Sequence, residues 1–235
     1  MKARLAITVE GDRVTGLSVD PPLGAKVRAT EYGPEIHIVT TAASLLEGDE
    51  LTINVQMGDD SRLTVRTVAA QMAHACIVGG STSMNVGVQM GKRARLVWQP
   101  EPLILCAQSN HRSSVDIDMD EGSALVWTDE LVLGRTDDDL TSIAFDARCT
   151  VRRHRRLLFD DGLHLDPSET HSWTGPSVLG SSRYLGTVLS FGDFRQPRRP
   201  ADDSRVTPMA LAVEGTLTRV VAIDPLLGRR QLAET

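Results

Sequence analysis

The sequence predicts a mostly β protein of stacked antiparallel or β-solenoid-like layered sheets, with little helix apart from a short one near the C-terminus. The first observation behind this prediction is a strand-turn-strand unit that occurs three times, at residues 55–63, 88–96 and 117–125. Each unit has a Met, then a polar turn that contains Gly, then a Leu six positions after the Met. The units recur about every 30 residues, a spacing typical of repeat architectures.

The second observation is that apolar residues occupy every second position before each Met. The pairs are Ile53 and Val55, Val86 and Val88, and Val115 and Ile117. Alternation at this period places these side chains on one face of a strand. Neighbouring units would bury such faces against one another, which favours stacked layers.

Shorter patterns on the N-terminal side of the repeat block, which covers about residues 47–134, predict further strands. Residues 1–20 are expected to form a hairpin, because Leu5, Ile7 and Val9 alternate before the Gly-Asp pair at residues 11–12. The Pro-Pro-Leu-Gly run at residues 21–24 breaks this pattern, and residues 36–40 are expected to form a short strand after it.

The C-terminal half should add strands, a loop and one helix. In order, the expected elements are a hairpin of residues 145–152 and 157–165, a strand at residues 184–189, an exposed loop at residues 195–204, and one or two strands within residues 211–221. Asp224 followed by Pro225 predicts an N-cap and a first helical residue, and hence a short helix. Gly228 weakens this helix, because Gly has a low helix propensity.

The composition is that of a soluble globular protein, with 41 % hydrophobic and 24 % charged residues, and a single domain over residues 1–235 is expected. The formal charge of −6 argues against nucleic acid as a partner. The N-terminal residues lack the apolar stretch of a signal peptide, and no apolar run approaches the roughly 18 residues of a membrane span. Three cysteines lie far apart with no disulfide pattern, which indicates a reduced, cytoplasmic protein.

Motifs of enzyme chemistry are missing from the sequence. The glycine cluster at residues 79–83 lacks the Gly-Lys-Ser/Thr ending of a phosphate loop, and there is no G-x-S-x-G, HExxH or CxxC. His74 and Cys76 come closest to a metal-binding pair, because residues two apart on a strand share a face. The alternative is a partly buried thiol beside an unrelated imidazole. The basic run at residues 152–156 fits a solvated hairpin end or a protein contact.

Three acidic residues occupy related places around the repeats. Asp49 precedes the first repeat strand, and Glu101 and Glu130 each lie 11 residues after the Met of their unit. Carboxylates that face an interior must be paired, hydrated or bound to a cation. Surface charges or turn caps are the alternative interpretation.

The segments at residues 47–55, 98–105 and 130–135 together resemble the UreD (UreH) family of urease accessory proteins, in order and in spacing. The resemblance covers nearly the whole chain, and the Glu-Leu-Val-Leu-Gly-Arg segment is its most specific part. It implies a layered, mostly β fold and a non-enzymatic chaperone. Members bind UreF, which recruits the GTPase UreG, and the assembly docks on apo-urease to assist GTP-dependent insertion of nickel.

The resemblance also implies roles for particular residues. Asp49, Glu101 and Glu130 match acidic positions of the family and would line a polar passage for Ni²⁺, which binds only transiently, so that no tightly bound cofactor is expected. The candidate contacts with partner proteins are Arg135, Pro225, Leu226, Leu227, Arg229 and Arg230. Two other classes stay open: a β-solenoid enzyme acting on polysaccharide through Asp137, Asp138 and Asp139, and a purely structural β scaffold.

Overall fold

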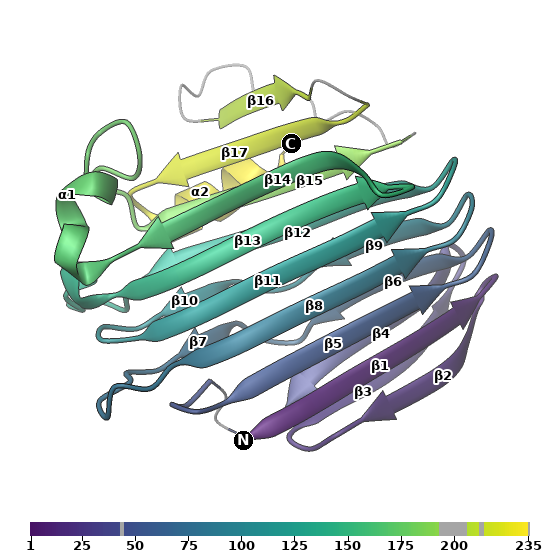
Figure 1. Cartoon of the computed structure of the whole chain (residues 1–235), viewed down its shortest axis with the longest axis horizontal. Helices are drawn as coiled ribbons and strands as arrows, with labels where there is room; N and C mark the ends of the chain where they lie inside the picture. The colour runs from purple at the N-terminus through teal and green to yellow at the C-terminus, as the bar shows by residue number, and fades with distance from the viewer. Residues whose placement is uncertain (43–44, 193–205, 212–213, 235) are drawn as a thin grey trace.

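The computed structural model describes residues 1–42, 45–192, 206–211 and 214–234. Within these residues the chain forms two large sheets that lie face to face (Figure 1). The strands of the seven-stranded first sheet, in spatial order, are β14 (Arg156–Leu165), β13 (Ala144–Arg153), β11 (Asn110–Met119), β8 (Thr82–Met90), β5 (Glu50–Met57), β1 (Lys2–Glu10) and β2 (Arg13–Val19).

The second sheet has ten strands. Its main path, in spatial order, is β16 (Val206–Ala210), β17 (Thr216–Ala222), β15 (Tyr184–Phe191), β12 (Ala124–Leu133), β9 (Arg95–Gln99), β6 (Arg62–Thr67), β4 (Gly33–Thr40) and β3 (Leu23–Thr30). Two short strands, β10 (Leu103–Leu105) and β7 (Gln71–Ala73), continue from β12 beside this path. The helices are α1 (Thr170–Trp173), α2 (Pro225–Ala233) and the 3₁₀ turns η1 (Leu140–Ser142) and η2 (Pro167–Glu169).

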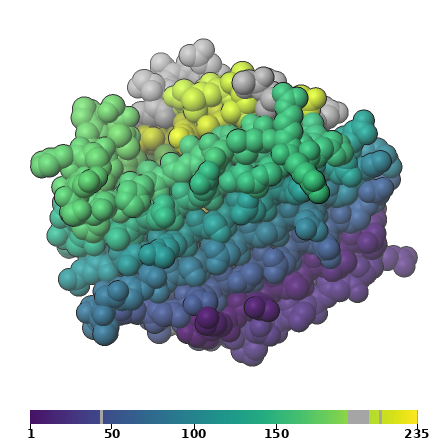
Figure 2. Space-filling model, viewed as in Figure 1, coloured from purple at the N-terminus to yellow at the C-terminus, as the bar shows by residue number. Residues whose placement is uncertain are grey.

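The predicted repeat is the basis of both sheets. The first strand of each unit lies in the first sheet and the second strand in the second sheet, so the two strands of a unit do not pair with each other. Equivalent strands of successive units pair in parallel instead, with Met57, Met90 and Met119 in register in the first sheet. The units therefore stack as layers, as in a β-solenoid, and the successive strands appear as parallel bands in the space-filling view (Figure 2).

The turns that link the sheets share one backbone shape. The third residue after the Met has a positive φ in every unit: 56° at Asp60, 57° at Arg93 and 69° at Gly122. Only the third unit has Gly there, the residue that adopts this conformation without strain. Asp60 and Arg93 form an exposed ion pair of 2.6 Å between neighbouring turns.

Other predicted elements are confirmed, with shifts at their ends. β1 and β2 form the N-terminal hairpin, β13 and β14 the basic-tipped hairpin, and β15 the strand after it. α2 begins at Pro225, and the Asp224 carboxylate accepts a hydrogen bond of 2.8 Å from the Leu226 amide. β3 was not predicted, because its exposed strand lacks a regular alternation. Of residues 211–221, the later part belongs to β17, and the loop predicted at residues 195–204 lies outside the described residues.

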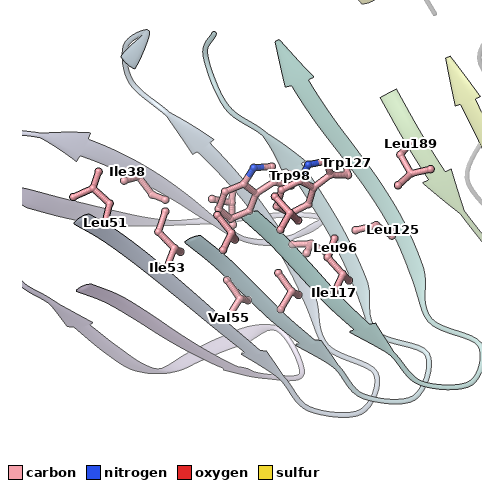
Figure 3. Packing of buried hydrophobic residues seen from close by; sticks show 14 of the residues in the cluster. Ile38, Leu51, Ile53, Val55, Leu96, Trp98, Ile117, Leu125, Trp127 and Leu189 are labelled. Carbon is pink, nitrogen blue, oxygen red and sulfur yellow. The ribbon is translucent and has the colours of Figure 1, made fainter. Parts of the chain in front are cut away.

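Two apolar clusters hold the described part of the chain together. The large one fills the space between the sheets, and at its centre Trp98 and Trp127 stack with their rings 4.7 Å apart (Figure 3). The small one lies under α2 and contains Tyr184, Val206, Val220, Ala222 and Leu232. None of the helices in the described segments is long and apolar enough to cross a membrane.

Candidate functional site

A cavity of about 170 Å³ lies between the two sheets. Apolar side chains from both sheets form most of its wall, including the stacked Trp98 and Trp127. Several polar residues also line it. They include Thr67, Glu101, Asp129, Glu130, Cys149, Asp161 and Arg219. An internal space with a few charged groups in an apolar wall is the usual form of a small-ligand site.

The second sheet is interrupted where the cavity reaches it. β12 pairs with β9 up to Trp127 and Trp98, and then with β10 from Leu131 and Leu103 onward. The intervening residues 99–102 include two prolines, which have no N–H to donate to a ladder. The cavity wall includes side chains of this segment, so the cavity extends to the break in the sheet.

Glu101 occupies the middle of this break. Its amide donates a hydrogen bond of 2.7 Å to Oγ1 of Thr67, which fixes the backbone of the Pro-Glu-Pro segment. Its carboxylate forms an ion pair of 3.0 Å with Arg229 of α2. Glu101 thus both lines the cavity and contacts the C-terminal helix.

Glu130 lies across the break from Glu101 and binds the same arginine. Its Oε2 accepts hydrogen bonds from Nε of Arg229 at 2.9 Å and from the Tyr184 hydroxyl at 2.8 Å. The Glu130 side chain is only 8 % exposed. Burial and the neighbouring Glu130 carboxylate raise the pKa of Tyr184 above its ordinary range, so this tyrosine stays a hydrogen-bond donor. Burial disfavours the Arg229 charge, but the two glutamates more than offset this and raise its pKa.

Asp129 is the functional candidate that sequence reasoning missed. It lies on the same face of β12 as Trp127 and Leu131, towards the space between the sheets, whereas Glu130 lies on the opposite face. Nε1 of Trp127 donates a hydrogen bond of 2.7 Å to its carboxylate. Asp129 is exposed rather than buried by its accessible surface, because its side chain lines the cavity. Burial raises the pKa of its carboxyl to about 6, despite the opposing effect of the Trp127 hydrogen bond.

A second charged group, contributed by other strands, lines the cavity. Asp161 of β14 forms an ion pair with Arg219 of β17, and this pair links the two sheets. Cys149 of β13 lies opposite Asp161 in the ladder. Burial, reinforced by the charges of Asp129 and Asp161, raises the pKa of the Cys149 thiol, which therefore stays protonated. The interior thus carries oxygen ligands and a neutral thiol.

Asp49 lies apart from this site. Its carboxylate forms an ion pair of 2.8 Å with the Met1 ammonium and accepts a hydrogen bond of 2.9 Å from the Leu46 amide. It is 5 % exposed and is not among the described residues that line the cavity. Asp49 therefore anchors the start of β5 beside β1, while Glu101 and Glu130 lie together at the break.

The predicted pair of His74 and Cys76 does not share a strand face. β7 ends at Ala73, and His74 and Cys76 lie in the segment that follows, so the expectation of a strand here is wrong. The Cys76 thiol lies 3.9 Å from the carbonyl oxygens of His74 and of Asn110. Within the described ranges, no group of three or more His, Cys, Asp or Glu side chains is arranged to hold a metal ion.

The acidic run considered for a polysaccharide enzyme forms a structured turn. Asp138 accepts hydrogen bonds from the backbone of Arg135 and Ala107 and forms an ion pair of 3.3 Å with the exposed Arg135. These contacts lower the pKa of Asp138 to about 2, and the hydrogen bond from the Arg135 amide has the largest effect. Asp139 caps η1 by accepting a hydrogen bond from the Thr141 amide. Local turn contacts therefore account for two of the three carboxylates.

The predicted partner-binding residues of α2 divide into two sets. Leu226 and Leu227 are 76 % and 45 % exposed, and Ile223 just before the helix is 50 % exposed. Arg230 is also exposed, whereas Arg229 turns towards Glu101 and Glu130. Gly228 packs against the Tyr184 ring, where an added Cβ would lie 2.2 Å from a ring carbon, which explains a Gly inside this helix.

The stacked sheets and the internal cavity with carboxylates at a break in one sheet define a layered β protein with a polar site inside it. Residues 2–234 match the family model described as UreD urease accessory protein. The urease accessory protein UreD of Streptomyces avermitilis is 31 % identical over 241 residues, which cover 99 % of this chain and 94 % of that protein.

Two further relatives cover the chain as fully. The urease accessory protein UreD of a Parafrankia species is 28 % identical, over 99 % of this chain and 86 % of that protein. The urease accessory protein UreD 3 of Streptomyces griseus is 30 % identical, over 99 % of this chain and 93 % of that protein. The chain belongs to the UreD family of urease accessory proteins, as the sequence motifs predicted.

Proposed function

We propose that this protein is a chaperone subunit of urease maturation that acts with UreF and the GTPase UreG. In this proposal the three proteins dock on apo-urease, and GTP hydrolysis by UreG accompanies delivery of nickel to the urease metallocentre. The protein contributes binding and transfer of Ni²⁺ rather than catalysis. Its site of action is the cytoplasm, and its three cysteines, all free, fit a reducing compartment.

The observation that carries the proposal is the cavity whose wall includes Asp129, Glu101 and Glu130. Glu101 and Glu130 lie at the break in the second sheet, where both form ion pairs with Arg229 of α2, which supports a polar route at this point. Oxygen ligands hold divalent ions such as Ni²⁺ less tightly than a closed cage of imidazole and thiolate groups. Such ligands suit a protein that passes nickel on, and nickel is here the cargo rather than a resident cofactor.

Partner binding is proposed for the exposed end of α2 and for Arg135. The exposed apolar residues Ile223, Leu226 and Leu227 lie close together in the chain, and burying them against a partner would remove apolar surface from water. Arg135 is exposed at the end of the most family-specific segment. UreF is the partner that we assign to this surface.

The proposed nickel path is tested by the combined variant Asp129→Asn, Glu101→Gln and Glu130→Gln, coexpressed with UreF, UreG and apo-urease. We expect the complex to assemble and nickel-dependent urease activation to fall at least about tenfold, because neutral amides are weaker ligands for a divalent cation than carboxylates. Glu31→Gln, an exposed surface change of the same type, is the control and should activate urease fully. Full activation by the combined variant would contradict the proposal.

A further inference from the structure

Arg229 bridges the two glutamates at the break in the second sheet. Its Nε donates to Oε2 of Glu130 at 2.9 Å, and its Nη2 lies 3.0 Å from Oε2 of Glu101. The two glutamates come from different segments of the chain, and among the described residues Arg229 of α2 is the cation that pairs with both. A planar guanidinium with separate N–H groups is well suited to hold two carboxylates at once.

A divalent cation at these glutamates would compete directly with Arg229. The guanidinium already occupies Oε2 of both carboxylates, and the hydroxyl of Tyr184 donates to the same oxygen of Glu130. A second cation beside Arg229 would also be repelled, and this repulsion is stronger in a partly buried site than in water. Glu101 and Glu130 can bind a divalent ion well only after Arg229 has moved away.

The attachment of α2 makes such a movement feasible. Only Gly228, Gln231 and Leu232 of the helix are buried, and it packs on the small apolar cluster rather than on the core between the sheets. The helix has nine residues, too few to be stable without tertiary contacts. Elements with few buried apolar contacts are the ones that open at the lowest free energy.

We propose that Arg229 is a built-in counter-ion that keeps Glu101 and Glu130 from binding a divalent cation, and that release of α2 exposes this carboxylate pair. The inference rests on the proposed function, since it describes how the same site is regulated. In this proposal α2 acts as a latch. When the helix is docked, Arg229 neutralises the two carboxylates, and when the helix is released, both carboxylates can bind Ni²⁺.

The test is calorimetric titration of the full chain with Ni²⁺ alone. Arg229→Gln should raise the affinity at least about tenfold, because it removes the competing charge. The gain should disappear when Glu101→Gln and Glu130→Gln are added to Arg229→Gln. Arg28→Gln, the same change at an exposed position of β3, is the matched control and should leave the affinity unchanged.

A second variant tests the latch with Arg229 intact. Leu232→Ala removes an anchor of α2 from the small cluster and should raise the Ni²⁺ affinity in the same glutamate-dependent way. The proposal is overturned if neither variant gains affinity, or if the gain persists without the two glutamates. If the gain is seen but the Glu101→Gln/Glu130→Gln protein still activates urease fully, the latch stands and the proposed nickel path falls. If no gain is seen and that protein fails to activate, the latch falls and the path stands.

Discussion

The repeat block and the C-terminal segment meet along β12, and they are packed in different ways. In the block, β5, β8 and β11 stack in register with β6, β9 and β12 opposite them. Apolar side chains, with the stacked Trp98 and Trp127, pack most of the space between them. In the C-terminal segment, α2 contributes Leu232 to a small cluster with four buried residues of the sheet and is held further by the ion pairs of Arg229. The block thus fixes the carboxylates in place, and the segment supplies a contact that can be undone.

The largest expected effect comes from the same truncation made in each region. Leu96→Ala in the block, at a position with no exposed surface, should lower the free energy of unfolding by about 3 kcal/mol or more, because it leaves a cavity in a packed core. Leu232→Ala in the small cluster should cost about 2 kcal/mol or less, because the site under α2 can relax. Urea denaturation of both variants measures the difference. Equal losses would show that the two regions are packed equally well.

A smaller effect on stability is expected at Asp129, because the folded protein disfavours the ionised form of its carboxyl group. Its carboxyl has an ordinary pKa of 3.8 and a folded pKa of about 6, so the folded state binds the proton more tightly than the unfolded state. The bound proton of Asp129 therefore stabilises the folded state in full below about pH 4, and this stabilisation is lost as the pH rises through about 6. Asp129→Asn avoids the loss and should be more stable than the wild type at about pH 8, by about 1 kcal/mol after allowing for solvent in the cavity.

The measurement is thermal or urea unfolding of Asp129→Asn and wild type across this pH range. The stabilities of the two proteins should converge below about pH 4, separate between about pH 4 and 6, and differ by a constant amount above about pH 6. Asp118→Asn, at an exposed position of β11, is the control and should not change the pH profile. A constant difference at every pH would mean that the carboxyl of Asp129 is solvated as well in the folded as in the unfolded state.

The repeat was enough to predict the layered fold, because a period of two and a constant Met-to-Leu spacing can be satisfied only by strands that bury one face. The sequence did not show that the strands of a unit belong to different sheets. A residue with positive φ in the turn, such as Asp60, Arg93 or Gly122, is also typical of hairpins, so the turn sequence does not distinguish the two arrangements.

The candidate site was predicted in part. Glu101 and Glu130 stood out through their equal distance from the repeat Met, and the structure brings them together on one arginine. Arg229 could not be found as their partner, because it lies 99 residues beyond Glu130 and no local pattern connects them. Asp129 could have been found, since it occupies an inward position in the alternation of Trp127 and Leu131.

The most direct test of the central claim is reconstitution of urease activation with and without this protein. Coexpression with UreF and UreG should give a complex that coelutes in size-exclusion chromatography and activates apo-urease in a nickel-dependent manner. Omitting this chain should abolish activation. If the chain elutes alone, and urease is activated equally well without it, the proposed chaperone function is wrong.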